Sequence, residues 1–159
     1  MSKISIVIPV HNEEENLHPL MDELLPVLLH YDETKDFEIV IVNDNSTDRT
    51  PAIIEELGKS NPRIRPVHRH SNPGFGNAVK EGFKNATGDI IIPVMGDLSD
   101  DPHDIPKLVK KIEEGYDIAY GSRFTKGGKT EGYPATKMIA NRAFNNSVRL
   151  LFGIRHKDI

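Results

Sequence analysis

Short apolar runs rich in β-branched residues recur along the chain and limit the folds that it can adopt. The runs that we predict to be strands cover residues 4–9, 37–42, 64–68, 90–95 and 117–121. Between them, apolar residues at helical spacing predict helices over about residues 17–29, 50–59, 77–86, 105–114 and 134–152. Strands that alternate with helices indicate an α/β fold with a mostly parallel sheet and right-handed crossovers. Pro66 predicts an edge position or a bend for the third strand, because proline cannot donate to a ladder.

The composition is that of a soluble protein. The chain has 159 residues, which predicts a single domain with a core of its own, and 37% of them are hydrophobic. It has no cysteine, which excludes disulfides and cysteine-ligated zinc and fits a reducing compartment. No signal peptide is visible after Met1, and the apolar runs are far shorter than the roughly 20 residues that span a bilayer. We therefore expect a cytoplasmic protein.

The net charge of −4 hides an asymmetry between the two parts of the chain. Residues 1–120 contain 12 Lys and Arg against 22 Asp and Glu, whereas residues 121–159 contain 8 against 2. A basic segment on an acidic body predicts an anionic partner, either a phosphate or a lipid headgroup, with peripheral membrane contact. Charges on a solvated helix are the alternative explanation. We expect no nucleic acid partner.

Residues 89–102 join a buried strand to a cluster of carboxylates. The apolar run ends at Gly96, where the chain can turn tightly, and Asp97 follows at the end of the strand. Clustered carboxylates repel one another unless a cation or solvent compensates them, and their oxygens suit Mg²⁺ or Mn²⁺. We therefore interpret Asp97 as a metal ligand. Metal binding and a structural role, such as capping the next helix, are equally good interpretations for Asp100, Asp101 and Asp104.

Polar side chains follow successive predicted strands. In a parallel sheet the carboxyl ends of the strands meet at one edge, and ligands bind in the crevice outside that edge. We expect a crevice for a nucleotide-type ligand that is lined by His11, Glu13, Asp44, residues 72–76, Asp97 and Arg123. This interpretation requires Asp44 and Asp97 to share a single cleft.

Two familiar phosphate-binding motifs do not fit the sequence. The first strand-to-helix turn contains no glycine, so the dinucleotide motif G-x-G-x-x-G is absent where it would be needed. Residues 128–130 resemble the end of a P-loop, but that motif requires glycine at the position of Arg123. The sequence therefore gives little support for an NAD site or a P-loop.

Six motifs occur in an order that is typical of one enzyme family. They are VIPVHNEEEN (7–16), IVNDNSTDRT (41–50), GFGNA (74–78), ATGD (86–89), GDLS (96–99) and GSRF (121–124). With them the chain resembles the family 2 inverting glycosyltransferases, and within that family the dolichyl- or polyprenyl-phosphate mannose or glucose synthases. The resemblance covers nearly the whole chain.

The resemblance implies a GT-A fold, a nucleotide-sugar donor and a divalent metal, Mg²⁺ or Mn²⁺, in a single catalytic domain over residues 1–159. The implied reaction moves mannose or glucose from GDP-mannose or UDP-glucose to a polyprenyl or dolichyl phosphate, with inversion. A lipid phosphate is already ionised at neutral pH, so it attacks without a general base and has only to be held in line. Such an acceptor implies a location at the cytoplasmic face of a membrane.

The resemblance also gives roles to individual residues. Asp97 corresponds to the last Asp of the D-x-D metal motif, and Ser99 is a second candidate ligand. Arg123 corresponds to the basic residue that meets the acceptor phosphate, and Asp97 and Arg123 are the expected catalytic residues. Lys137 and Asn141 correspond to positions that help to hold that phosphate. The residues implied to bind the nucleotide sugar are Pro9, His11, Glu13, Asp44, Asn72, Gly76 and Asp97.

The chain departs from the family pattern in three places. Met95 replaces the first Asp of D-x-D, so metal coordination depends on Asp97, with Ser99, water and the donor diphosphate. Asn43 replaces the first Asp of an Asp-Asp pair and keeps the hydrogen bonding without the charge. Relatives continue beyond a residue that corresponds to Asp158, so we interpret the chain as a catalytic domain truncated at its C-terminal end.

Two other functions fit the same motifs. One is a soluble family 2 transferase with a glycan hydroxyl acceptor, which would need a general base such as Asp100 or Asp101. The other is a fragment that binds nucleotide sugars without turnover, which Met95 suggests.

Overall fold

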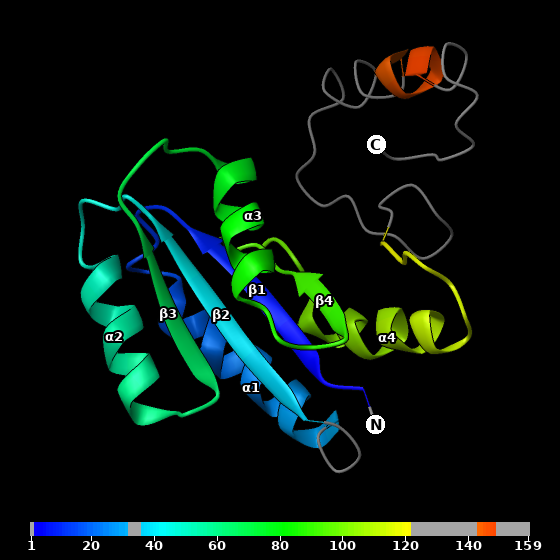
Figure 1. Ribbon diagram of the computed structural model, residues 1–159, viewed down its shortest axis with the longest axis horizontal. Coiled ribbons are helices and arrows are strands. Elements are labelled where there is room, and N and C mark those ends of the chain that lie inside the picture. The colour runs from blue at the N-terminus through cyan, green and yellow to red at the C-terminus, as the bar shows by residue number, and fades with distance from the viewer. Residues whose placement is uncertain (1, 32–35, 122–142, 149–159) are drawn as a thin grey trace. The chain divides into compact units, whose positions relative to one another are not determined.

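The computed structural model describes residues 2–31, 36–121 and 143–148. The chain divides into two compact units, Met1–Asp117 and Ile118–Ile159. The described strands all belong to the first unit, and in the second unit the described residues 143–148 are helical (Figure 1).

A four-stranded parallel sheet forms the centre of the first unit. Its strands are β1 (Ile4–Val10), β2 (Phe37–Asp44), β3 (Ile64–Arg69) and β4 (Ile90–Pro93), in the order β3-β2-β1-β4 (Figure 1). The chain proceeds from β1 to β3 on one side of β1, and then returns to place β4 on the other side. The end of β1 is therefore a switch point in the strand order, where α/β sheets bind their ligands.

Helices cover both faces of this sheet (Figure 1). On one face α1 (Leu17–Tyr31), α2 (Thr50–Ser60) and α4 (Ile105–Glu113) pack against the isoleucines of β1 and β2, and a 3₁₀ helix η1 (Pro102–Asp104) leads into α4. On the other face α3 (Phe75–Asn85) places Ala78 against valines of the same strands. Every residue of β1 is buried, as expected for a central parallel strand that is covered on both sides.

The close packing of α3 on the sheet depends on Gly82. A Cβ atom added at this position would lie 2.2 Å from Cγ1 of Val7, well inside van der Waals contact. The glycine therefore lets the helix axis approach β1. This approach brings the N-terminus of α3 to the carboxyl end of the sheet, where the candidate site lies.

Most of the predicted elements are confirmed, and Pro66 does lie in an edge strand of the described sheet. The fifth predicted strand, residues 117–121, is wrong: these residues form no strand, and Ile118 is 78% exposed. A strand exists through ladder hydrogen bonds to a neighbour, and no described strand pairs with this segment. Of the predicted helix 134–152, residues 143–148 are helical and the others lie outside the described residues. No helix in the described part of the chain is long and apolar enough to cross a bilayer.

Candidate functional site

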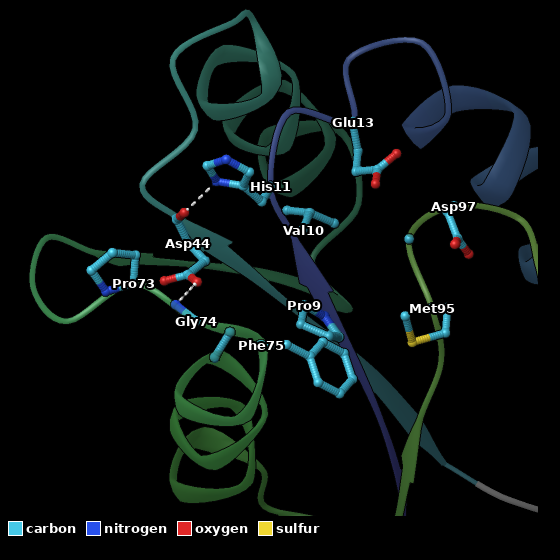
Figure 2. A pocket seen from close by; sticks show the side chains of 12 residues that line it. Pro9, Val10, His11, Glu13, Asp44, Pro73, Gly74, Phe75, Met95 and Asp97 are labelled. Atoms are coloured by element: carbon cyan, nitrogen blue, oxygen red, sulfur yellow. Dashed lines mark hydrogen bonds between the residues drawn. The ribbon is translucent and has the colours of Figure 1, made fainter.

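A cavity of 440 Å³ lies at the carboxyl ends of β1 and β2, beside the N-terminus of α3 and the segment that follows β4 (Figure 2). Its lining residues come from four separate stretches of sequence: Pro9, Val10, His11, Glu13, Asp44, Pro73, Gly74, Phe75, Ala78, Met95, Gly96 and Asp97. Asp44 and Asp97 both belong to this lining, so the two carboxylates share one cleft, as the sequence analysis requires.

Asp44 is the centre of a buried hydrogen-bond network. Asp44 is 5% exposed, and its carboxylate accepts a hydrogen bond from the guanidinium of Arg69. It also accepts from the backbone N–H of Gly74 at 2.6 Å (Figure 2). Arg69 also donates to the carbonyl oxygens of Ser71 and Asn72, at 2.9 and 3.0 Å. Asp44 and Arg69 together hold the loop before α3 against the end of β2.

Arg69 is a site residue that the sequence reasoning missed. It lies opposite Asp44 in the register of β2 and β3, one residue beyond the predicted end of the third strand. The sequence does contain a signal for this pair, because an acidic residue ends one strand and a basic residue ends the next strand along the chain. The parallel register between the two strands is needed to interpret it.

His11 connects β1 to the end of β2. Its Nδ1 lies 2.7 Å from the carbonyl oxygen of Asp44, and because a carbonyl only accepts, Nδ1 carries a proton (Figure 2). Glu13 also lines the cavity, while its carboxylate accepts from Asn16 at 2.6 Å and its backbone N–H donates to Thr50 at 2.8 Å. Pro9 lies between these residues and Phe75 on the wall of the cavity (Figure 2).

Asp97 is exposed and lies across the cavity from Asp44 (Figure 2). One of its carboxylate oxygens accepts from the backbone N–H of Ser99 at 3.1 Å, and no described residue donates to the other oxygen. The turn is shaped by Leu98, whose φ of 62° lies in the left-handed region. The side chain of Met95 lines the cavity beside Asp97 (Figure 2).

The neighbouring acidic residues have structural partners. Asp100 accepts from the backbone N–H of Met95 at 2.8 Å. Asp101 caps η1 by accepting from the backbone N–H of His103. This bond and a second one from the His103 side chain lower the pKa of Asp101. Asp104 pairs with Lys107 at 2.5 Å. The capping interpretation of this cluster is therefore confirmed for Asp101.

The described residues contain no cluster of three or more His, Cys, Asp or Glu side chains that could hold a metal ion. The chemistry of the donors nevertheless fits Mg²⁺ or Mn²⁺ bound together with a diphosphate, since such ions commonly use one or two carboxylates plus substrate phosphates. Asp97 supplies a carboxylate oxygen on the cavity wall that no described residue occupies. The Met95 thioether supplies no hard oxygen ligand beside it.

Not every predicted site residue lines the cavity. Asn72 and Gly76 are exposed and do not line the cavity. Pro73 and Gly74, from the same segment of residues 72–76, do line it. Ser99 contributes its backbone N–H to Asp97. Three predicted acceptor-phosphate residues lie outside the described residues: Arg123, Lys137 and Asn141. The lining residues that lie outside the expected set are Val10, Ala78, Met95 and Gly96.

Comparison with known proteins places this chain in a family. Residues 5–157 match the family described as Glycosyl transferase family 2. The dolichol-phosphate mannosyltransferase of Pyrococcus furiosus is 39% identical over 140 residues, which are 88% of this chain and 38% of that protein. The undecaprenyl-phosphate 4-deoxy-4-formamido-L-arabinose transferase of Proteus mirabilis is 32% identical over 140 residues, which are 87% of this chain and 42% of that protein.

A solved structure agrees with the fold. The glucosyl-3-phosphoglycerate synthase of Mycobacterium tuberculosis, in complex with Mn²⁺, UDP and phosphoglyceric acid, aligns with a TM-score of 0.55 and 26% identity. The alignment covers 70% of this chain and 39% of that one. The predicted GT-A fold is confirmed by such neighbours, and the chain spans about two fifths of the length of the curated relatives above. The chain belongs to glycosyl transferase family 2.

Proposed function

We propose that the cavity binds the nucleoside diphosphate of a nucleotide sugar, and that the protein transfers its hexose to a polyprenyl phosphate. The observation that carries the proposal is that Asp44 and Asp97, from separate strand ends, line one cavity at the switch point of the sheet. The cavity volume of 440 Å³ lies within the range of ordinary small-molecule sites. The relatives from Pyrococcus furiosus and Proteus mirabilis, named for dolichol phosphate and undecaprenyl phosphate, support the choice of acceptor class.

The nucleoside would lie against the wall that carries Asp44. His11 and Pro9 border that wall, and Phe75 adds an aromatic face on which a base can stack. Both oxygens of Asp44 already accept hydrogen bonds, from Arg69 and Gly74. Asp44 therefore helps to hold this wall in shape, and its ionised carboxylate keeps acceptor capacity for a donor of the ligand.

The diphosphate would lie toward Asp97, which we propose as the carboxylate that holds Mg²⁺ or Mn²⁺ with help from Ser99. A bound metal ion supplies Lewis acidity that neutralises the charge developing on the departing diphosphate. The Mn²⁺ and UDP bound in the Mycobacterium tuberculosis enzyme support this choice of cofactor and donor class. GDP-mannose and UDP-glucose are the donors that we propose to test.

The acceptor would be held by the basic part of the chain. An ionised phosphate attacks the sugar without a general base, and Arg123, Lys137 and Asn141 are the residues that we propose to orient it. The guanidinium of Arg123 offers the fork geometry that matches a phosphate. The excess of basic residues in 121–159 would also favour an anionic membrane surface, and we therefore propose a location at the cytoplasmic face of a membrane.

Two alternatives make different demands on the same residues. A hydroxyl acceptor requires a general base, and Asp100 and Asp101 are instead engaged with backbone N–H groups of Met95 and His103. Binding without turnover is favoured by Met95, which leaves Asp97 without a second carboxylate beside it. The second alternative predicts nucleotide binding with no product.

A thermal-shift screen followed by a transfer assay tests the proposal. GDP, UDP, GDP-mannose and UDP-glucose are added with and without Mn²⁺, and a nucleotide that binds the folded state raises the melting temperature. The favoured sugar nucleotide is then incubated with the full chain and a polyprenyl phosphate, and the glycolipid is measured. Lack of any nucleotide-dependent shift would contradict the site, and binding without glycolipid would leave the non-catalytic alternative.

A further inference from the structure

We propose that His68, which does not line the cavity, is a positioning residue for the nucleotide pocket. In its neutral form it fixes the side-chain amide of Asn43, and through Asn43 it fixes the loop of residues 43–47 that carries Asp44. This inference rests on the proposed function, in that it takes the cavity to bind a nucleoside diphosphate. Neither Asn43 nor Ser46 lines the cavity, so the chain of contacts acts through the loop backbone.

The orientation of the Asn43 side chain is determined by its surroundings. Asn43 lies near the end of β2 and is 4% exposed. Its Oδ1 lies 3.0 Å from the backbone N–H of Ser46, which can only donate, so the oxygen has to face the loop. The Nδ2 group therefore faces β3, where it lies 3.2 Å from Nδ1 of His68.

This geometry selects one protonation state of His68. An amide Nδ2 group only donates, so Nδ1 of His68 has to accept and cannot carry a proton. The proton of the neutral ring is then on Nε2, which lies 3.0 Å from a carboxylate oxygen of Glu55 on α2. Each of the three contacts in the series Glu55, His68, Asn43 and Ser46 then joins a donor to an acceptor.

Protonation of His68 breaks this series at Asn43. A proton on Nδ1 would point at the Nδ2 donor of Asn43, and a rotated amide would place Nδ2 against the N–H of Ser46 instead. One of the two bonds is lost in either case, and the affected amide is buried. Acid that protonates His68 is therefore expected to weaken the hold on the residues that follow Asp44.

The groups around His68 are few and come from two sides. Glu55 on α2 is the facing carboxylate, and His70 stacks on the ring with centroids 6.4 Å apart. Arg69, the residue between them on the chain, directs its guanidinium to Asp44. Glu55 therefore accepts from Nε2 while Asn43 donates to Nδ1, so the two neighbours contact opposite ring nitrogens of His68.

The loop that Asn43 holds is joined to the pocket by further bonds. The hydroxyl oxygen of Ser46 accepts from the backbone N–H of Asn12 at 3.0 Å, and Oδ1 of Asn12 accepts from the N–H of Thr47 at 2.8 Å. His11 donates to the carbonyl oxygen of Asp44. Release of Ser46 therefore loosens both strand-end loops that form this wall of the cavity.

The test uses three substitutions in the full chain and one matched control. His68→Leu removes the acceptor from Asn43. His68→Asn keeps an acceptor near the place of Nδ1 and does not titrate. Asn43→Asp replaces the Nδ2 donor that faces Nδ1 of His68 with a second acceptor. The control, His70→Asn, removes the exposed neighbouring ring. The affinities of GDP and UDP with Mn²⁺ are measured by calorimetry at pH 7.5 and 5.5.

At pH 7.5 we expect His68→Leu to weaken binding of the favoured nucleotide by about fivefold to tenfold. His68→Asn and the His70→Asn control are expected to bind like the wild type. At pH 5.5 the wild type and the control are expected to lose affinity. His68→Asn is expected to lose less, because its loss comes only from other groups of the protein and from the nucleotide itself. Asn43→Asp is expected to keep its affinity at pH 5.5, because the carboxylate that it introduces would accept from a protonated His68.

Unchanged affinity in His68→Leu, or an equal acid-induced loss in His68→Asn and the wild type, would overturn the proposal. If no nucleotide binds the wild type, the proposed function fails, and hydrogen exchange at the Ser46 amide then decides the positioning role. That amide is expected to lose protection in His68→Leu and to keep it in His68→Asn. Equal protection in both variants would overturn the proposal independently of any ligand.

Discussion

Polar networks join β1 and β2 at both ends of the sheet, and they differ in what they hold in place. At the amino end, Glu38 accepts from the hydroxyl of Ser5 at 2.6 Å and from the N–H and hydroxyl of Thr87 at 2.6 and 2.9 Å, with Lys3 at 3.3 Å. At the carboxyl end, the network around Asp44 forms the wall of a 440 Å³ cavity.

The two networks hold different kinds of structure in place. Glu38 and Ser5 fasten the loop before β4 to β1 and β2, and Gly88 completes the contact by donating to Ser5 at 2.8 Å. This end is complete without a ligand. At the carboxyl end Asp44 holds the wall of the cavity, while Asp97 keeps an oxygen to which no described residue donates. Stability and ligand binding should therefore respond differently to substitution at Glu38, Asp44 and Asp97.

The largest loss of stability is expected from Asp44→Ala. The substitution leaves the guanidinium of Arg69, 11% exposed, without its carboxylate, and breaking a buried pair in this way costs about 3–5 kcal/mol. Urea unfolding measures the loss, and calorimetry is expected to detect no nucleotide binding. Asp44→Asn is the matched control, because it keeps an acceptor for Gly74 and should recover part of the stability. A fully stable Asp44→Ala variant would contradict the role of this network.

A smaller loss, without any change in nucleotide affinity, is expected from Glu38→Gln. The amide keeps the size of the side chain but removes the charge that Ser5, Thr87 and Lys3 share, and hydrogen bonds to a charged group contribute about 1.5–3 kcal/mol. Urea unfolding should report a loss of about that size. A change in the nucleotide dissociation constant would show that the two ends of the sheet are coupled, which contradicts the comparison.

The pH dependence of unfolding separates the networks further. Burial alone would raise the pKa of Glu38, but the hydrogen bonds from Ser5 and Thr87 and the charge of Lys3 lower it to about 2 from 4.5. A depressed pKa stabilises the fold above pH 4.5, and that contribution is lost as the pH falls toward 2. The shift corresponds to at most about 3 kcal/mol. The free energy of unfolding of Glu38→Gln should therefore depend less on pH between about 5 and 2 than that of the wild type, and equal slopes would contradict the assignment.

The sequence predicts the positions of the strands and helices well where the pattern is local. The buried strands β1 and β2 read as continuous apolar runs, and Asp44 and Asp97 follow strand ends that parallel pairing brings to one edge. The failed strand at 117–121 has suitable residues, but strand formation depends on a partner that a local pattern does not specify.

The parts of the site that the sequence did not predict depend on contacts between distant segments. Arg69 acquires its role from its register with Asp44, and His68 from its register with Asn43. Ala78 reads as an ordinary apolar helix residue until α3 is packed at the end of the sheet. These roles follow from strand register and helix packing, which residue types alone do not determine.

The smallest effect on stability, and a large effect on binding, is expected from Asp97→Ala. Asp97 is exposed and accepts a hydrogen bond from the N–H of Ser99, so unfolding should change by no more than about 0.5 kcal/mol. If Asp97 holds the metal, Mn²⁺ should no longer strengthen nucleotide binding in this variant. Asp100→Asn is the matched control, because its side chain supports the Met95 backbone from within the same turn. Retention of the Mn²⁺ effect in Asp97→Ala would refute the metal role. Loss of the effect with unchanged stability would show that metal binding does not depend on the network around Asp44, which holds the carboxyl end of the sheet together.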